Sequence, residues 1–215
     1  MQRTVSSSIE LLSQPRRAIV EYIKTHQPVR AEQIARDLNV TVSGIRQHLA
    51  ALSAEGLVTH DVVRGQPGRP KHAFRLTDRG LELFPRNYAG LAAEMIEFVG
   101  EEDPEMLDRV FERRVKAQLD RVAPLLGDRP LKERVQVLVR FLNDEGFMAE
   151  MEERDDGTMV IVMRNCALLE VAKVNQHVCG SDLELLRRAL PDANVDRTSH
   201  AIEDGPFCAY EVKAG

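Results

Sequence analysis

Residues 31–58 read AEQIARDLNVTVSGIRQHLAALSAEGLV, and this stretch decides the fold of the first part of the chain. Apolar residues recur at helical spacing on both sides of Asn39-Val40, which predicts two helices over 31–38 and 41–55 joined by a tight turn. The hydroxyl of Thr41 is suited to cap the second helix, and Gly56 is suited to end it. The stretch therefore predicts a helix-turn-helix.

The second of these helices is predicted to have a polar face suited to reading DNA. Ile45, Leu49 and Leu52 are spaced to face inward, and an arginine and a glutamine lie on the opposite face. Arginine side chains bond the major-groove edge of guanine, and glutamine side chains bond that of adenine. The predicted DNA-binding residues of this helix are Thr41, Ser43, Arg46 and Gln47.

The flanking segments favour a winged helix-turn-helix. A helix is expected over 9–26, with its regular part starting at Pro15. Two strand-like runs, 57–64 and 71–77, enclose a turn-rich tip and predict a β-hairpin, or wing. Helix-turn-helix patterns also occur in ordinary helical proteins, so the hairpin at the expected place is what favours DNA binding. The wing residues expected to contact the minor groove and phosphates are Arg64, Arg69 and Lys71.

Charge is distributed unevenly along the chain. Residues 1–90 hold 13 basic and 8 acidic residues, whereas residues 91–215 hold 16 basic and 26 acidic residues. A basic N-terminal part joined to an acidic remainder suits a nucleic-acid-binding domain tied to a second domain, although chance segregation of surface charge gives the same pattern.

Other features of the sequence limit which classes of protein are expected. No apolar run approaches the ~18 residues needed to cross a bilayer, and residues 1–8 have no signal-peptide character, so we expect a cytoplasmic protein without membrane contact. An enzyme is the least expected class, because the sequence has no glycine-rich phosphate loop, nucleophile elbow or His-Glu-x-x-His motif.

The middle and C-terminal parts predict an α+β organisation. We divide the chain into a winged-helix domain (1–84), a helical linker that pairs two subunits (85–128) and a C-terminal sensor domain (129–215). Linker helices are expected over 87–98 and 104–119, with Pro124 and Gly127 near the end; packing within one chain is the alternative to dimerisation. A homodimer would suit a palindromic operator in double-stranded DNA. The sensor domain is expected to contain helices over 131–143, 165–175 and 181–190 and antiparallel strands over 147–153, 158–163, 194–200 and 207–212.

All three cysteines, Cys166, Cys179 and Cys208, lie in the sensor domain at predicted element boundaries or in its last strand. Their spacing differs from the Cys-x2-Cys pattern of a zinc ribbon. Three thiolates brought together from such places could hold an iron–sulfur cluster, and the alternative is three buried or unrelated thiols.

Nearly the whole chain resembles the SufR-like repressors of iron–sulfur cluster assembly. In the N-terminal half the resemblance rests on residues 33–35, 43–49, 55–58 and 68–71, which many winged-helix families share. Its more specific part is Asn165-Cys166, Val178-Cys179 and Cys208 after an acidic-glycine turn. The resemblance implies a winged-helix dimer with an iron–sulfur cluster of the [4Fe–4S] type, which represses cluster-assembly genes while the cluster is bound.

The sequence departs from the resembled family at one ligand position. Four-cysteine members have a third cysteine where this chain has Ala193, which has no donor atom, so a four-cysteine site is excluded. Two ways of holding a cluster remain: three thiolates with a fourth ligand of another type, or three thiolates with one iron that has no protein ligand. The candidate fourth ligands are His177, His200, Asp182 and Glu170. A small-molecule-responsive regulator and a zinc-stabilised regulator are the alternatives without a cluster.

Overall fold

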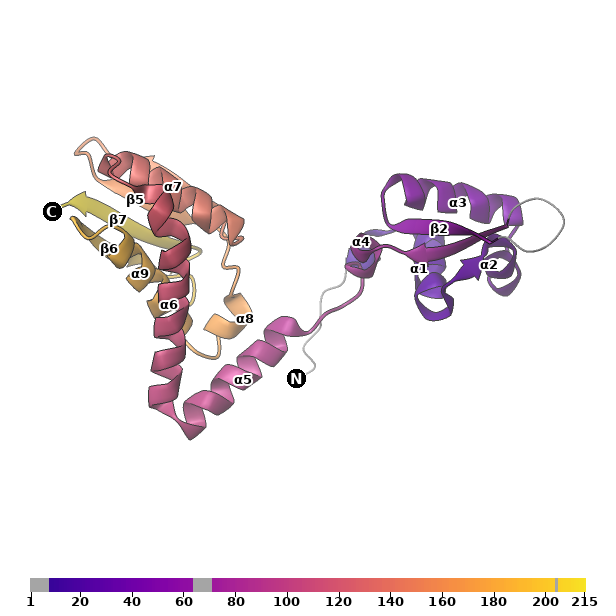
Figure 1. Ribbon diagram of the computed structural model, residues 1–215, viewed down its shortest axis with the longest axis horizontal. Helices are drawn as coiled ribbons and strands as arrows, with labels where there is room; N and C mark the ends of the chain where they lie inside the picture. Colours follow the sequence, from indigo (N-terminus) through magenta and orange to yellow (C-terminus); the bar gives the residue numbers. More distant parts are fainter. Residues whose placement is uncertain (1–7, 64–70, 204) are drawn as a thin grey trace. The chain divides into compact units, whose positions relative to one another are not determined.

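The computed structural model describes residues 8–63, 71–203 and 205–215, and the chain divides into two compact units between Asn87 and Tyr88 (Figure 1). Each unit has its own core and is described separately.

The first unit has the architecture of a winged helix. It contains a three-stranded antiparallel sheet in the order β1-β3-β2, in which Val58 lies opposite Leu76 and Val29 lies opposite Phe74. Strand β1 has only two residues and was not predicted. The elements are η1 (Ser8–Leu11), α1 (Gln14–His26), β1 (Val29–Arg30), α2 (Ala31–Asp37), α3 (Val42–Ala54), β2 (Val58–Val63), β3 (Lys71–Leu76) and α4 (Asp78–Leu81).

The local signals in the sequence act at the ends of these helices. Pro15 lies in the first turn of α1, where the missing N–H has no intrahelical partner to lose. Gly56 follows α3 with φ of 70°, a left-handed conformation that glycine adopts without steric cost. The apolar faces then meet in one core, whose fully buried members include Ile19, Ile23, Ile34, Ile45, Leu49 and Leu52.

The second unit is an α+β domain with a four-stranded antiparallel sheet in the order β4-β5-β7-β6. Met159, Ile161 and Met163 of the central strand β5 join the main core, which also receives side chains from α6, α7 and α9. The predicted fold class is therefore confirmed. The elements are α5 (Tyr88–Glu102), α6 (Pro104–Leu126), α7 (Leu131–Asp144), β4 (Ala149–Glu153), β5 (Met159–Met163), α8 (Leu169–Ala172), α9 (His177–Ala189), β6 (Ala193–Ser199) and β7 (Cys208–Ala214).

The predicted linker is part of this second unit. Val115, Val122 and Leu126 of α6 are buried in the main core, so this helix is not a separate connection. Helix α6 also continues seven residues beyond the predicted end at Leu119, through Pro124. Proline is tolerated there because the carbonyl that loses its partner belongs to the exposed residue Asp120.

The segment between β5 and β6 differs from the prediction. The helix expected over 165–175 is reduced to the four residues of α8, because the backbone N–H of Asn165 bonds Phe147 O at 3.0 Å and its side chain bonds Gly146 O at 2.7 Å. Helix α9 begins at His177 rather than Ser181. Cys179 consequently lies in the first turn of a helix and not between two helices.

None of the described helices combines the length and apolar character that crossing a lipid bilayer would require.

Candidate functional site

Helix α3 presents the predicted DNA-reading face to solvent. Ser43, Arg46 and Gln47 are exposed, whereas Ile45 and Leu49 on the other face are buried. The hydroxyl of Thr41 accepts a hydrogen bond from Gly44 N at 3.1 Å, as expected for an N-cap. The helix is therefore anchored by its apolar face and fixed at its N-terminal end, where a major-groove helix meets base edges.

Arg46 has a partner that the sequence analysis missed. Its guanidinium donates to Glu32 Oε1 of α2 at 2.7 Å, and more than half of each side chain is exposed. No pattern in the sequence points to this pair, because the two residues are brought together only by the packing of α2 against α3.

Both strands of the wing, β2 and β3, are among the described residues. Val63 lies opposite Lys71 at the end of the β2–β3 ladder. The rings of His60 and His72 make an edge contact with centroids 4.3 Å apart. The predicted contact residues Arg64 and Arg69 lie outside the described residues.

The three cysteines converge on one region of the second unit. Cys208 opens β7 opposite Met163, the last residue of β5, and Cys166 follows that strand by three residues. Cys179 comes from α9. All three are free thiols, with Cys179 and Cys208 buried and Cys166 half-buried. The backbone N–H of Ala201 donates a hydrogen bond to Cys208 Sγ at 3.4 Å.

The thiols are close enough to influence one another electrostatically. Burial raises the pKa of Cys179 to about 11, and the charges of Asp182, Cys166 and Cys208 contribute to this increase. Burial also raises the pKa of Cys166, and negative charge on Cys208 and Asp182 adds to it. Grouped thiolates without a cation are unfavourable, which is the situation that a bound metal centre relieves.

Buried polar side chains surround the cysteines. Asp182 is 7% exposed, and burial raises its pKa to about 6 although Arg114 and Arg197 act in the opposite direction. Arg114 Nη2 lies 3.9 Å from Asp182 Oδ1. The guanidinium of Arg197 donates to the carbonyl of Cys179 and stacks over the ring of Tyr210, 5.7 Å from its centroid. The sequence analysis did not single out either arginine.

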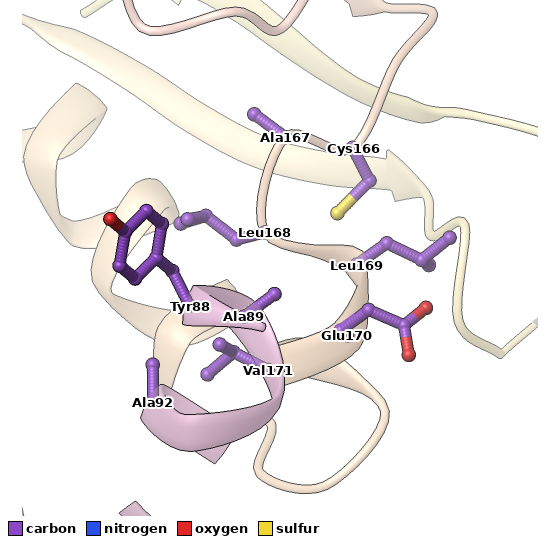
Figure 2. Close-up of a pocket in the computed structure, with 9 residues that line it drawn as sticks. All are labelled: Tyr88, Ala89, Ala92, Cys166, Ala167, Leu168, Leu169, Glu170 and Val171. Atoms are coloured by element: carbon purple, nitrogen blue, oxygen red, sulfur yellow. The ribbon is translucent and has the colours of Figure 1, made fainter. Parts of the chain in front are cut away.

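A pocket reaches one of the thiols. It has a volume of about 450 Å³ and is formed by the start of α5 and the segment 166–171. Figure 2 shows the sulfur of Cys166 pointing toward the space between Leu168 and Leu169, with Tyr88 on the opposite side. Small molecules in solvent therefore have a mostly apolar route to Cys166.

Comparison with known proteins supports the assignment of the first unit. Residues 15–69 match a protein family described as HTH domain. The first unit therefore contains an HTH domain, and its sheet and helices have the winged-helix architecture described above.

Comparisons with solved structures and with curated proteins do not extend this assignment. A crystal structure of the PcaV transcriptional regulator from Streptomyces coelicolor, in complex with its natural ligand, is 21% identical over 49% of this chain and 75% of that chain, with a TM-score of 0.30. That similarity is too low to support an argument about this protein. No curated protein matches the chain.

The three cysteines are thiol donors of the kind that bind metal centres. Among the described residues, no three His, Cys, Asp or Glu side chains are arranged to hold one metal ion. A cluster spreads its ligands over several iron atoms, so its thiolates need not converge on one point. The residues that would hold it are Cys166, Cys179 and Cys208.

Proposed function

We propose that this protein is a homodimeric repressor whose binding to a palindromic operator is controlled by an iron–sulfur cluster, of the [4Fe–4S] type, on Cys166, Cys179 and Cys208. The observation that carries the proposal is that α9, β7 and the segment between β5 and α8 each bring one thiol to the same part of the second unit, where the thiols influence one another electrostatically. The resemblance to SufR-like repressors agrees with it. When bound, the cluster supplies an oxidant-sensitive centre whose loss frees its ligands.

The position of the thiols supports a link to DNA binding. Cys179 belongs to a small core, distinct from the main one, and Cys166 packs against it. Ile96 and Val99 of α5 pack against the same core, as do residues of α6, α8 and α9. Helix α5 directly follows the DNA-binding unit in the chain. A change at the cysteines would therefore alter the packing of α5, the helix that follows the DNA-binding domain in the chain.

An exposed apolar face on α5 supports dimerisation. Leu91, Met95 and Phe98 are each more than half exposed and recur at the three- and four-residue spacing of a helix-pairing seam. Solvated apolar side chains in a row are unfavourable, and a second copy of the same helix would cover them. A two-fold dimer built here would present two recognition helices to two half-sites.

The proposed mechanism follows from these contacts. A cluster held by Cys166, Cys179 and Cys208 would join the segment before α8 to α9 and β7, and would thereby fix the small core against which α5 packs. The pocket of Figure 2 would give oxidants a route to Cys166, and loss of the cluster would loosen that core. The dimer then no longer favours the operator spacing, because the two states bind DNA with different free energy.

The test is an anaerobic absorbance spectrum of the purified protein with iron and sulfide assays. Wild type and Ser181→Ala should be brown and contain iron and sulfide, whereas Cys166→Ser, Cys179→Ser and Cys208→Ser should lose most of both. Ser181 is the matched control because it is buried in α9, two residues from Cys179, where its hydroxyl bonds Val178 O.

The pocket favours one other candidate function, a regulator that responds to an apolar small molecule bound between α5 and α8. A colourless, iron-free wild type would favour this candidate and contradict the cluster. Zinc in place of iron would identify the zinc-stabilised alternative.

A further inference from the structure

Resting on the DNA-binding part of the proposed function but not on the cluster, we infer that the winged-helix unit itself binds a neutral, mainly apolar small molecule that opposes DNA binding. The site is a pocket between the start of α1 and the first half of α3, formed wholly by residues 14–48. Its volume of about 620 Å³ lies within the roughly 300–1,000 Å³ range of ligand sites.

The floor of the pocket reaches the core of the unit. Ile19 and Ile45 line the pocket although they are only 1% and 2% exposed, so the space ends at side chains that are otherwise closed to solvent. The lining residues Ala18 and Gly44 have little or no side chain, and an added Cβ at Gly44 would meet Thr41 Oγ1 at 3.2 Å. A small molecule can enter such a space, whereas a folded protein surface would cover only its rim.

The composition of the lining selects the chemical class of the ligand. Among the described residues, no lysine, arginine, aspartate or glutamate lines the pocket, so a phosphate or another strongly charged group would find no counter-charge there. Pro15, Leu38 and Val40 add apolar contact surface, and Val40 is 51% exposed until a ligand covers it. An uncharged apolar molecule is therefore the occupant that fits.

Two polar side chains of the lining would orient such a molecule. The amide of Gln14 comes from α1 and the half-buried imidazole of His48 from α3, and neither is hydrogen-bonded to any described residue. Both side chains can donate and accept hydrogen bonds. A hydroxyl, carbonyl or amide group of the ligand would bond to them while the rest of the ligand packs on the apolar floor.

The pocket flanks the predicted DNA-reading face of α3. Gly44 and His48 directly follow Ser43 and Gln47, and each lies about 100° around the helix from the residue before it. The major groove is about 12 Å wide and a helix with its side chains fills about 10–12 Å of it, so little room remains for a ligand on the flank. The ligand and the operator should therefore weaken each other's binding.

The first measurement uses the full chain and the neutral fluorophore N-phenylnaphthylamine, whose emission rises in apolar surroundings. Wild type should bind the fluorophore saturably, and Ala18→Leu, which fills the pocket from α1, should weaken binding at least about tenfold. Ala54→Leu is the matched control, because it adds the same side chain at an exposed position of α3 outside the pocket, and it should bind like wild type.

The second measurement locates the fluorophore and tests its effect on DNA. Hydrogen–deuterium exchange should show protection within residues 14–48 and not at the separate pocket beside Cys166. Saturating fluorophore should lower the affinity of wild type for a duplex that it selects from a random library, and should not change the affinity of Ala18→Leu. Circular dichroism checks folding, and Val40→Ser, at the exposed rim, replaces Ala18→Leu if that variant is unstable.

The possible results are distinct. Absence of saturable binding, equal binding by wild type and the pocket variant, or an unchanged affinity for DNA would each overturn this inference. A wild type that selects no duplex would instead contradict the proposed function, and the regulatory role of the pocket would fail with it. Fluorophore binding is measured without DNA, so the two failures can be told apart.

Discussion

At the scale of single residues, Arg46 on the predicted DNA-reading face forms an ion pair with Glu32. Its ion pair with Glu32 joins two exposed side chains, and such pairs contribute about 0–1 kcal/mol to stability. If Arg46 reads a guanine, the two acceptors of that base edge would replace the single hydrogen bond to Glu32. Because the ion pair with Glu32 is exposed, breaking it on such a contact would cost little.

Arg46→Ala should weaken operator binding by about 1–3 kcal/mol and relax the preference for one base pair. The measurement is fluorescence anisotropy with a duplex that the wild type selects from a random library. Glu32→Gln, which only releases Arg46, is the control and should bind at least as well as wild type. Equal affinity of Arg46→Ala and wild type would remove Arg46 from the interface.

Thr41→Ala should destabilise the first unit by about 1 kcal/mol, because Gly44 N loses its capping acceptor. Chemical denaturation followed by circular dichroism measures the change, and Thr41→Ser, which keeps the hydroxyl, should restore most of the stability. If Thr41→Ser destabilises the unit as much as Thr41→Ala, the methyl group of Thr41 is responsible for the loss and the capping hydrogen bond is not.

At the scale of elements, α5 has two faces with different roles. Its inner face, with the buried residues Gly90 and Ala93, packs within the second unit, and its outer face carries the exposed apolar side chains. The small residues of the inner face allow close packing. The large apolar residues of the outer face stabilise the protein only if another surface covers them.

Leu91→Glu should weaken dimerisation by about 2 kcal/mol or more, roughly thirtyfold, because a charge would be buried in the proposed seam. Sedimentation equilibrium measures the dissociation constant. Glu97→Ala alters an exposed position on the same helix away from the apolar row and should leave the dimer intact. A Leu91→Glu protein that stays dimeric would place the interface elsewhere.

At the scale of the whole molecule, the proposal requires the cluster and the operator to influence each other across two units. Removing the cluster with a chelator should lower operator affinity about 5- to 150-fold, the range typical of coupled sites. Anaerobic anisotropy titrations of the holoprotein and apoprotein measure this ratio, and Cys208→Ser should match the apoprotein. Equal affinities would leave a cluster without a regulatory role.

The sequence determined most of what is local. Pro15, Thr41 and Gly56 mark helix ends through their own backbone preferences, and the periodicity of Ile45 and Leu49 fixes which face of α3 is buried. The winged helix, the α+β class and the four strands of the second sheet could therefore be predicted before any contact was known, because each depends on short-range pattern.

The tertiary structure decided what depends on residues distant in the chain. Asn165 leaves the predicted helix because its backbone and side chain bond the turn at 146–147, and α6 extends because the main core buries it. The sequence could name Cys166, Cys179, Cys208 and Asp182 as candidates. Only packing brings their charges within reach of one another and buries Asp182, because burial and electrostatic coupling are properties of the folded environment and not of the residue type.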